Sequence, residues 1–490
     1  MRNLIWIFIV FSFFSLAQEI ELSGNWQYKI GSGDWKNVQL PADLSKVEPD
    51  YKGDAYFRLK KTIEVPLEVL DMKTVRLQIE GVTPFCAILI NGEPLDTIKN
   101  FFSLFDKNIK ESLLPGENEI VLEFIPASWV MEKVWKKRNT DLTEKMKKLS
   151  VEMEVRQPRY MFKEQTIGTF GKMRLIGVEH TQVKALNFKM LSDTEGRVKV
   201  LAKLRADVFE SGQYKFESNY FTHEEKILTG RDRDIIWTFF IDDFKFWYPR
   251  GLGSPDFIKD KMKVSFMRLD GKEYQEEVEL EYKIGFNKIE LIQNPKEEDD
   301  FTFEMEGLEL DLTTTVYRHR YFADPEAQGA YYTNFFKKLA TTEVNMVHVD
   351  GGGGYPSNQF YDFCDSLGVI VWQDFAFAGL GYPADSMLFK STRSEVDYQL
   401  RRITQFPSFL LFSGSHDLSP IFQSESAATD LGFSKKDWKL LDKGQSDLFG
   451  RIIPIQINRF NTRVYYKAYS PDFGVKNSSE LKFGSYIVID

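Results

Sequence analysis

Cysteine is scarce in this sequence, because Cys86 and Cys364 are the only two among 490 residues. They belong to different predicted domains, so the pattern excludes a disulfide-built scaffold and predicts two small buried side chains. A surplus of basic charge is lacking as well, since the net charge is −9 and no long run of Lys or Arg occurs. The sequence therefore lacks the electrostatic footprint of a protein that binds nucleic acid or an anionic membrane surface.

Long hydrophobic runs are lacking beyond the first residues of the chain. Leu4–Phe14 is almost wholly apolar, Arg2 precedes it, and small residues follow at Ser15 and Ala17. The run is too short to span a bilayer comfortably, and its flanks are typical of a signal peptide. We predict a signal peptide over residues 1–17, export to the periplasm or the extracellular space, and no membrane span.

The length of the chain predicts about three domains rather than one core. Residues 18–180 contain short alternating strands separated by turn pairs such as Asn91-Gly92, which predicts a β-sandwich. Residues 181–285 continue the alternation and form a second β segment. Residues 286–490 change to a strand–loop–helix rhythm, which is typical of a parallel α/β barrel.

The barrel segment contains fewer strand candidates than a closed (β/α)8 barrel requires. The candidates are Leu308–Thr315, Val344–Val349, Val369–Val371, Phe409–Phe412, Val464–Ala468 and Tyr486–Ile489. The sequence therefore predicts an incomplete barrel, with the first and last strands each unpaired on one side. Because open sheet edges promote pairing with another chain, we also predict self-association through this edge.

Polar or aromatic side chains stand where three of these strands end: His348, Asp350, Trp372, Asp374, His416 and Asp417. In such barrels the chemistry lies at the carboxyl ends of the strands, so these residues are the candidate site. Two His and two Asp could also ligate zinc, although their spacing lets only some of them converge. The competing interpretation is ordinary polar substitution. The run Gly351–Gly354 is no phosphate loop, since it lacks a following Lys-Ser/Thr.

Three blocks of this region resemble the β-mannosidase branch of glycoside hydrolase family 2. Phe360–Ala378 matches the family pattern F-Y-D-x-C-D-E-L-G-I-x-V-W-Q-D-F-x-F-A nearly residue for residue. Asn345–Gly354 and Phe409–Asp417 match the patterns N-M-x-R-x-W-G-G-G and W-S-G-N-N-E in frame, but not at their polar positions. Earlier in the chain, Phe246–Gly253 resembles the family pattern W-W-P-x-G-x-G.

This resemblance implies a domain order and an activity. It implies a jelly roll over 18–180, an immunoglobulin-like sandwich over 181–285 and an incomplete TIM-type barrel over 286–490. The implied activity is retaining hydrolysis of terminal β-mannosides without a cofactor, with carbohydrate as the partner. In the family the jelly roll also lends a Trp-Asp-Trp loop to the active site, and here the matching residues are Glu164, Gln165 and Thr166.

The catalytic positions implied by the resemblance are altered. Asp417 stands where the family has the acid/base Glu, and its carboxyl falls about 1 Å short, which can cost about a hundredfold in rate. No residue matches the nucleophile, whose position would lie beyond Asp490. His416, His348 and Asp350 replace the family's Asn, Arg and Trp.

Trp372 and Asp374 remain as in the family. Trp372 could line the pocket or be a buried strand residue, and Asp374 could bind a sugar hydroxyl or orient loops. Three hypotheses follow from the altered site. The protein is a slow hydrolase using Asp417, a non-catalytic sugar-binding relative, or a fragment of a longer family 2 enzyme.

Overall fold

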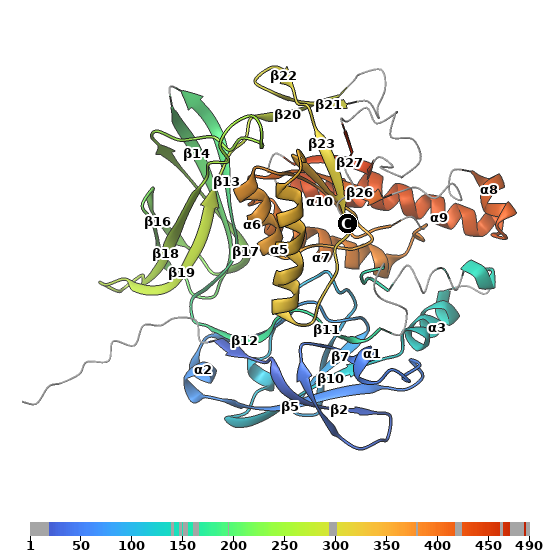
Figure 1. Ribbon diagram of the computed structural model, residues 1–490. Helices are drawn as coiled ribbons and strands as arrows, with labels where there is room; N and C mark the ends of the chain where they lie inside the picture. The colour runs from blue at the N-terminus through green and yellow to red at the C-terminus, as the bar shows by residue number, and fades with distance from the viewer. Residues whose placement is uncertain are drawn as a thin grey trace, which may run out of the picture.

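The computed structural model describes residues 19–138, 142–146, 149, 155–159, 166–194, 196–293, 301–378, 381–416, 424–460, 464–470 and 485–486. The predicted signal peptide lies outside these residues. The helices and strands form three groups along the chain, drawn in blue to cyan, green, and yellow to red in Figure 1.

The N-terminal group is an antiparallel sandwich. One sheet has the order β1 (Glu19–Glu21), β12 (Met173–Val178), β6 (Thr74–Ile79), β9 (Phe105–Asn108). The other has the order β3 (Lys36–Leu40), β2 (Gly24–Ile30), β5 (Phe57–Val65), β10 (Gly116–Phe124), β7 (Cys86–Ile90), β8 (Glu93–Ile98). Buried residues alternate along β10, as the strand pleat requires, and the inward faces share one apolar core.

Short elements complete this sandwich: β4 (Ala42–Asp43) paired with β11 (Gly168–Thr169), α1 (Leu44–Val47), α2 (Leu67–Asp71), the 3-10 turn Lys110–Ser112 and α3 (Ala127–Arg138). The charged stretch around α3 also contributes to the core. Leu142, Met146 and Leu149 are buried against the barrel helices. Their spacing of four and three residues corresponds to one face of a helix.

The middle group consists of two further antiparallel sheets, and most of its residues lie in long strands. One sheet contains β13 (Thr181–Thr194), β14 (Arg197–Val208) and β17 (Gly230–Ile241). The other contains β16 (Thr222–Ile227), β15 (Gly212–Glu217), β18 (Ile258–Arg268) and β19 (Gln275–Ile284). Their facing residues form a separate core. This group is joined to the barrel by Trp247, whose indole N–H donates to the carbonyl of Asp365 at 2.9 Å.

A small antiparallel sheet precedes the barrel, built from β20 (Ile289–Gln293), β21 (Phe301–Met305) and β22 (Leu308–Glu309). The prediction of one strand over Leu308–Thr315 is therefore wrong in its first half. Leu308 pairs with Met305 across a tight turn, because Glu306 and Gly307 adopt positive φ angles that reverse the chain. The barrel sheet begins only at β23 (Thr313–Tyr317).

The barrel sheet is parallel and has six strands among the described residues, in the order β27, β26, β25, β24, β23, β28. Its further strands are β24 (Met346–Val349), β25 (Ile370–Asp374), β26 (Phe409–His416), β27 (Tyr465–Ser470) and β28 (Ser485–Tyr486). The expectation that the first barrel strand is an open edge is wrong, since Thr313 and Thr314 pair with β28. A curved barrel sheet brings strands from the end of the chain beside its first strand. The order of strands along the sequence does not reveal which strands pair in this way.

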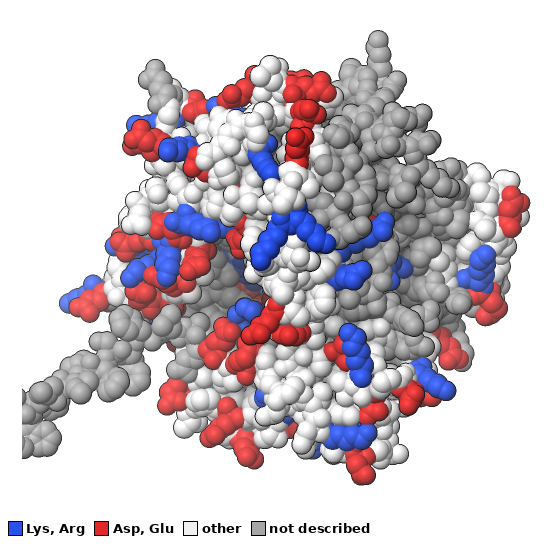
Figure 2. Space-filling view, in the orientation of Figure 1, with Lys and Arg blue, Asp and Glu red and all other residues white. Residues whose placement is uncertain are grey.

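Helices cover the outside of this sheet (Figure 1). They are α5 (Pro325–Ala340), α6 (Asn358–Leu367), α7 (Ser386–Ile403), α8 (Glu425–Asp430), α9 (Lys435–Asp447), a π-helical turn Leu448–Ile452 and α10 (Ile453–Phe460). The largest apolar core lies between sheet and helices, and both cysteines are buried, as predicted. No helix of the described part is long and apolar enough to cross a bilayer. Figure 2 shows acidic and basic side chains interspersed on one face.

Candidate functional site

The predicted site residues that the structure describes lie at the carboxyl ends of neighbouring barrel strands. His348 on β24 is opposite Trp372 on β25, and Asp374 is opposite Ser413 on β26. Alternation along parallel strands places these residues on one face, above an apolar layer that includes Met346. His348, Trp372 and Asp374 are all fully buried.

His348 and Asp374 form a direct pair inside the barrel. The imidazole Nε2 lies 2.9 Å from the Asp374 Oδ1, and neither side chain is exposed. The imidazole also packs edge-to-face on Trp372, with ring centroids 5.5 Å apart. A buried carboxylate requires several partners to replace the water it has lost. The histidine at the position of the family's arginine supplies one of them.

Further donors converge on Asp374. The hydroxyls of Ser413 and Ser470 donate to it, the latter at 3.3 Å, and the backbone N–H of Gly351 donates at 3.3 Å. The carboxylate thereby connects β25, β26, β27 and the loop after β24. Ser413 also accepts the indole N–H of Trp372 at 2.7 Å.

This arrangement has a definite chemical meaning. Ser413 donates to Asp374 and accepts from the Trp372 indole, and it is fully buried, so its hydroxyl has no surface at which to meet a substrate. Among the described residues, no group of three or more His, Cys, Asp and Glu side chains is placed to hold a metal ion. The cluster is therefore arranged as a buried hydrogen-bond network.

Asp350 organises the glycine turn that follows β24. Its carboxylate accepts the N–H of Gly352 at 2.8 Å, and the Nε of the largely exposed Arg318 lies 3.3 Å from it. The turn packs so closely that side chains would not fit. A Cβ at Gly351 would come 2.3 Å from the carbonyl oxygen of Phe375, and one at Gly353 would come 2.6 Å from the backbone nitrogen of His319. The glycines at these two positions of the turn thus have a steric cause.

The side chains of two predicted site residues, Asp417 and His416, are not described by the structure. Asp417 lies outside the described residues, as do Glu164 and Gln165 of the jelly-roll loop. The backbone of His416 ends β26, where it pairs with Ser470, and its side chain is not described. The zinc alternative and the acid/base assignment therefore stay predictions.

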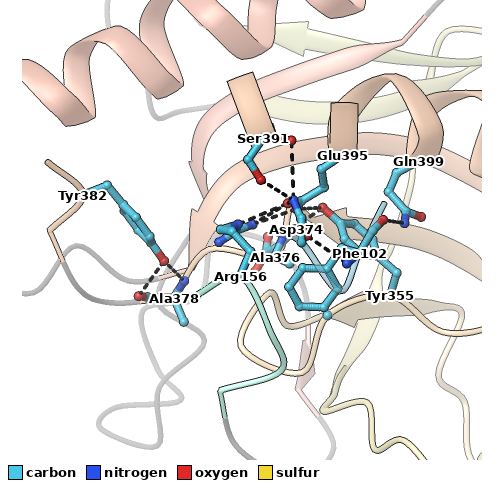
Figure 3. Close-up of polar contacts among 12 residues, drawn as sticks. Phe102, Arg156, Tyr355, Asp374, Ala376, Ala378, Tyr382, Ser391, Glu395 and Gln399 are labelled. Carbon is cyan, nitrogen blue, oxygen red and sulfur yellow. Dashed lines mark hydrogen bonds and ion pairs between the residues drawn. The ribbon is translucent and has the colours of Figure 1, made fainter. Parts of the chain in front are cut away.

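A buried ion pair behind the site was not predicted from the sequence. Arg156, from the N-terminal sandwich, binds Glu395 on α7 through two nitrogens, with the shortest N–O distance 2.7 Å (Figure 3). Both side chains are essentially unexposed. Burial opposes the charge on Arg156, but the attraction and hydrogen bonds of Glu395, together with Tyr382 and Tyr355, outweigh burial and raise the pKa of the guanidinium. The pair joins two domains at a dry contact.

Glu395 has further partners that reach the site loops. It accepts hydrogen bonds from Asn100 at 2.9 Å and from the Tyr355 hydroxyl at 2.8 Å, and that hydroxyl accepts the N–H of Ala376 (Figure 3). Tyr355 and Ala376 directly follow the glycine turn and β25. One sequence feature could have indicated that Glu395 is buried. It follows Leu388 and Thr392 at helical spacing, on the buried face of α7.

Comparison with known proteins shows what this chain is similar to. Residues 43–163 match the family model described as glycosyl hydrolase 2 galactose-binding domain-like. A β-mannosidase B of Aspergillus oryzae is 23% identical over 414 residues, which is 81% of this chain and 48% of that protein. The β-mannosidase B of Neosartorya fischeri is 28% identical over 251 residues, covering 50% of this chain and 29% of that protein. The chain thus spans about half the length of the curated relatives it matches.

Solved structures agree with this at the level of the fold. A β-D-mannosidase from Dictyoglomus thermophilum superimposes with a TM-score of 0.76 and 21% identity, covering 94% of this chain and 58% of that one. This chain is similar to the β-mannosidases of glycoside hydrolase family 2. A putative β-galactosidase from Bacteroides fragilis gives a TM-score of 0.66 with 16% identity, covering 92% of this chain and 63% of that one. The predicted fold class, a jelly roll and an immunoglobulin-like sandwich before a TIM-type barrel, is confirmed for this β-mannosidase-like chain. The exact domain boundaries stay predictions.

Proposed function

We propose that this β-mannosidase-like chain is an exported protein that recognises mannosides and hydrolyses them poorly or not at all. The observation that carries the proposal is that the described site residues are buried and contact other groups of the protein. His348 and Asp350, at the positions of the family's Arg and Trp, are buried and bonded within the protein. Export is supported by the signal-peptide pattern over residues 1–17.

The chemistry of retaining glycosidases supports the second half of this proposal. Such enzymes use two carboxyl groups about 5–5.5 Å apart, one of which must protonate the leaving oxygen. Asp350 and Asp374 have no exposed surface with which to reach a substrate. Asp417 is one methylene shorter than the glutamate that the family uses. Among the described site residues, neither Asp350 nor Asp374 is thus placed to donate a proton to a substrate.

We expect no measurable turnover of an aryl β-mannoside by the purified chain. Asp417→Glu alone should not restore activity, because catalytic groups that act as a unit contribute non-additively. Initial rates of the wild type, Asp417→Glu and Asp417→Ala would be compared at saturating substrate. Turnover that disappears in Asp417→Ala would show instead that the chain is a slow hydrolase using this aspartate.

We also propose that the chain self-associates through an edge of the barrel sheet. Among the described residues, β27 and β28 stand at the two ends of the sheet order, and sheet edges template pairing with another chain. Sedimentation velocity at micromolar concentration should detect a dimer or larger species whose fraction rises with concentration. A concentration-independent monomer would contradict this proposal.

A further inference from the structure

A cavity of about 720 Å³ lies between the N-terminal sandwich and the barrel helices. Phe101–Ser103 and Phe170 line it from the sandwich, and the barrel contributes His319, Tyr321, Phe322, Ala323, Gln328 and Arg402. None of His348, Asp350, Trp372 and Asp374 belongs to its wall. In Figure 1 this region is where the sandwich meets the helices α5 and α7. The volume falls within the range of about 300–1,000 Å³ that small-molecule sites occupy.

The aromatic part of the wall offers ring faces to a ligand. Phe170, Tyr321 and Phe322 are half-buried and line the cavity. The orientation of Tyr321 is fixed by Phe101, which also lines the cavity and packs edge-to-face on the tyrosine ring with centroids 4.9 Å apart. The face of an aromatic ring is electron-rich and attracts weakly positive C–H groups, which a pyranose ring presents on its faces.

The polar part of the wall has hydrogen-bonding groups that the protein leaves unused. Gln328 Nε2 and Ser103 Oγ are buried and have no hydrogen-bond partner within the described structure. The amide of Gln328 is fixed in orientation, since its Oε1 accepts the N–H of Phe322 at 3.1 Å. A buried donor without a partner is costly, so such atoms are normally satisfied by water or a ligand.

The charges around the cavity are nearly balanced. Lys172, Arg174 and Arg402 line it together with Glu21 and Glu80. The hydrogen bonds that Arg402 donates go to neutral acceptors, Gln399 Oε1, the Pro356 carbonyl and Asn358 Oδ1. A wall of mixed donors and acceptors without a strong net charge suits a neutral polyhydroxylated ligand better than a polyanion.

His319 adds a neutral imidazole to the same wall. The side chain is almost fully buried. Burial, with a smaller contribution from Arg402, lowers its pKa to about 3. At neutral pH the ring therefore carries one N–H donor and one acceptor nitrogen.

We propose that this cavity binds a short neutral saccharide at a site separate from the barrel interior. Aromatic side chains would pack against the C–H surface of a pyranose, and the amide of Gln328 and the hydroxyl of Ser103 would turn from their buried positions toward the cavity to bind its hydroxyls. The choice of manno-configured probes rests on the proposed function. The site itself rests on the cavity and its unsatisfied groups.

The test is calorimetric titration of the full chain with β-1,4-mannotriose and, separately, cellotriose. Phe322→Ala removes a ring face, and Gln328→Glu replaces the unused donor with an acceptor while keeping the size of the side chain. Each should weaken binding at least tenfold. Gln213→Glu, the same change on a strand of the middle sandwich, should leave binding unchanged, and Asp417→Ala is measured alongside to report on binding at the position that the family resemblance implies. Melting curves check that all variants are folded.

The outcomes separate this site from the proposed function. Binding that weakens only in Asp417→Ala would place the sugar in the barrel and overturn the cavity site while leaving mannoside recognition intact. Cavity-dependent binding of cellotriose without mannotriose would support the cavity site and overturn mannoside recognition. Absence of binding by either trisaccharide would overturn both.

Discussion

Arg156→Met should lower the free energy of unfolding by about 3–5 kcal/mol, because it leaves a buried carboxylate without its cation. Glu395 is fully buried and held by Arg156, Asn100 and Tyr355. The remaining neutral donors do not compensate for a full negative charge in a dry environment. Chemical denaturation followed by tryptophan fluorescence measures the loss. Arg156 joins the sandwich to α7, so separate transitions for the two domains are also expected.

Two controls show whether the effect comes from an unpaired buried charge. Arg197→Met removes a cation from an exposed pair, in which Arg197 and Asp242 are 57% and 72% exposed, and should cost at most about 1 kcal/mol. The double variant Arg156→Met, Glu395→Leu removes both charges and should recover part of the loss. A loss for Arg156→Met no larger than that of Arg197→Met would show that the pair contributes little.

Asp374→Ala should be the second severe substitution, with a loss of more than about 3 kcal/mol, because several buried donors lose their acceptor together. These donors are Ser413, Ser470 and the N–H of Gly351, and the His348 imidazole lies against the same carboxylate, with Nε2 2.9 Å from Oδ1. They come from neighbouring strands, so the carboxylate holds the carboxyl end of the sheet together. Thermal and denaturant unfolding measure the effect.

Asp311→Ala is the matched control for this prediction. Asp311 is an exposed carboxylate just before β23, and its loss should change stability by less than about 0.5 kcal/mol. Asp374→Asn distinguishes a structural role from sugar binding, since it keeps the shape and one acceptor. If Asp374→Asn abolished saccharide binding without destabilising the protein, the carboxylate would act on the ligand and the structural assignment would fall.

The strand ends of the barrel show which features of the site can be predicted from sequence and which cannot. The sequence around Gly351–Gly354 excluded a phosphate loop, and only the contacts of Gly351 and Gly353 show why side chains do not fit there. The sequence predicted that His348, Trp372 and Asp374 stand at the ends of successive strands. Parallel pairing places them side by side on β24 and β25. Sequence order did not reveal that β28 pairs with β23, because closure depends on how the whole sheet curls.

What the sequence determined by itself is the order of domains, the barrel strands and the family resemblance, since these depend on local periodicity and contiguous motifs. Only the tertiary structure decided the partners of charged residues. Arg156 and Glu395 are 239 positions apart, and nothing local in either segment indicates the other. The same holds for the cavity, whose wall combines two domains. Burial and pairing are properties of the packed chain, because the environment that makes a charge costly or useful is assembled from distant segments.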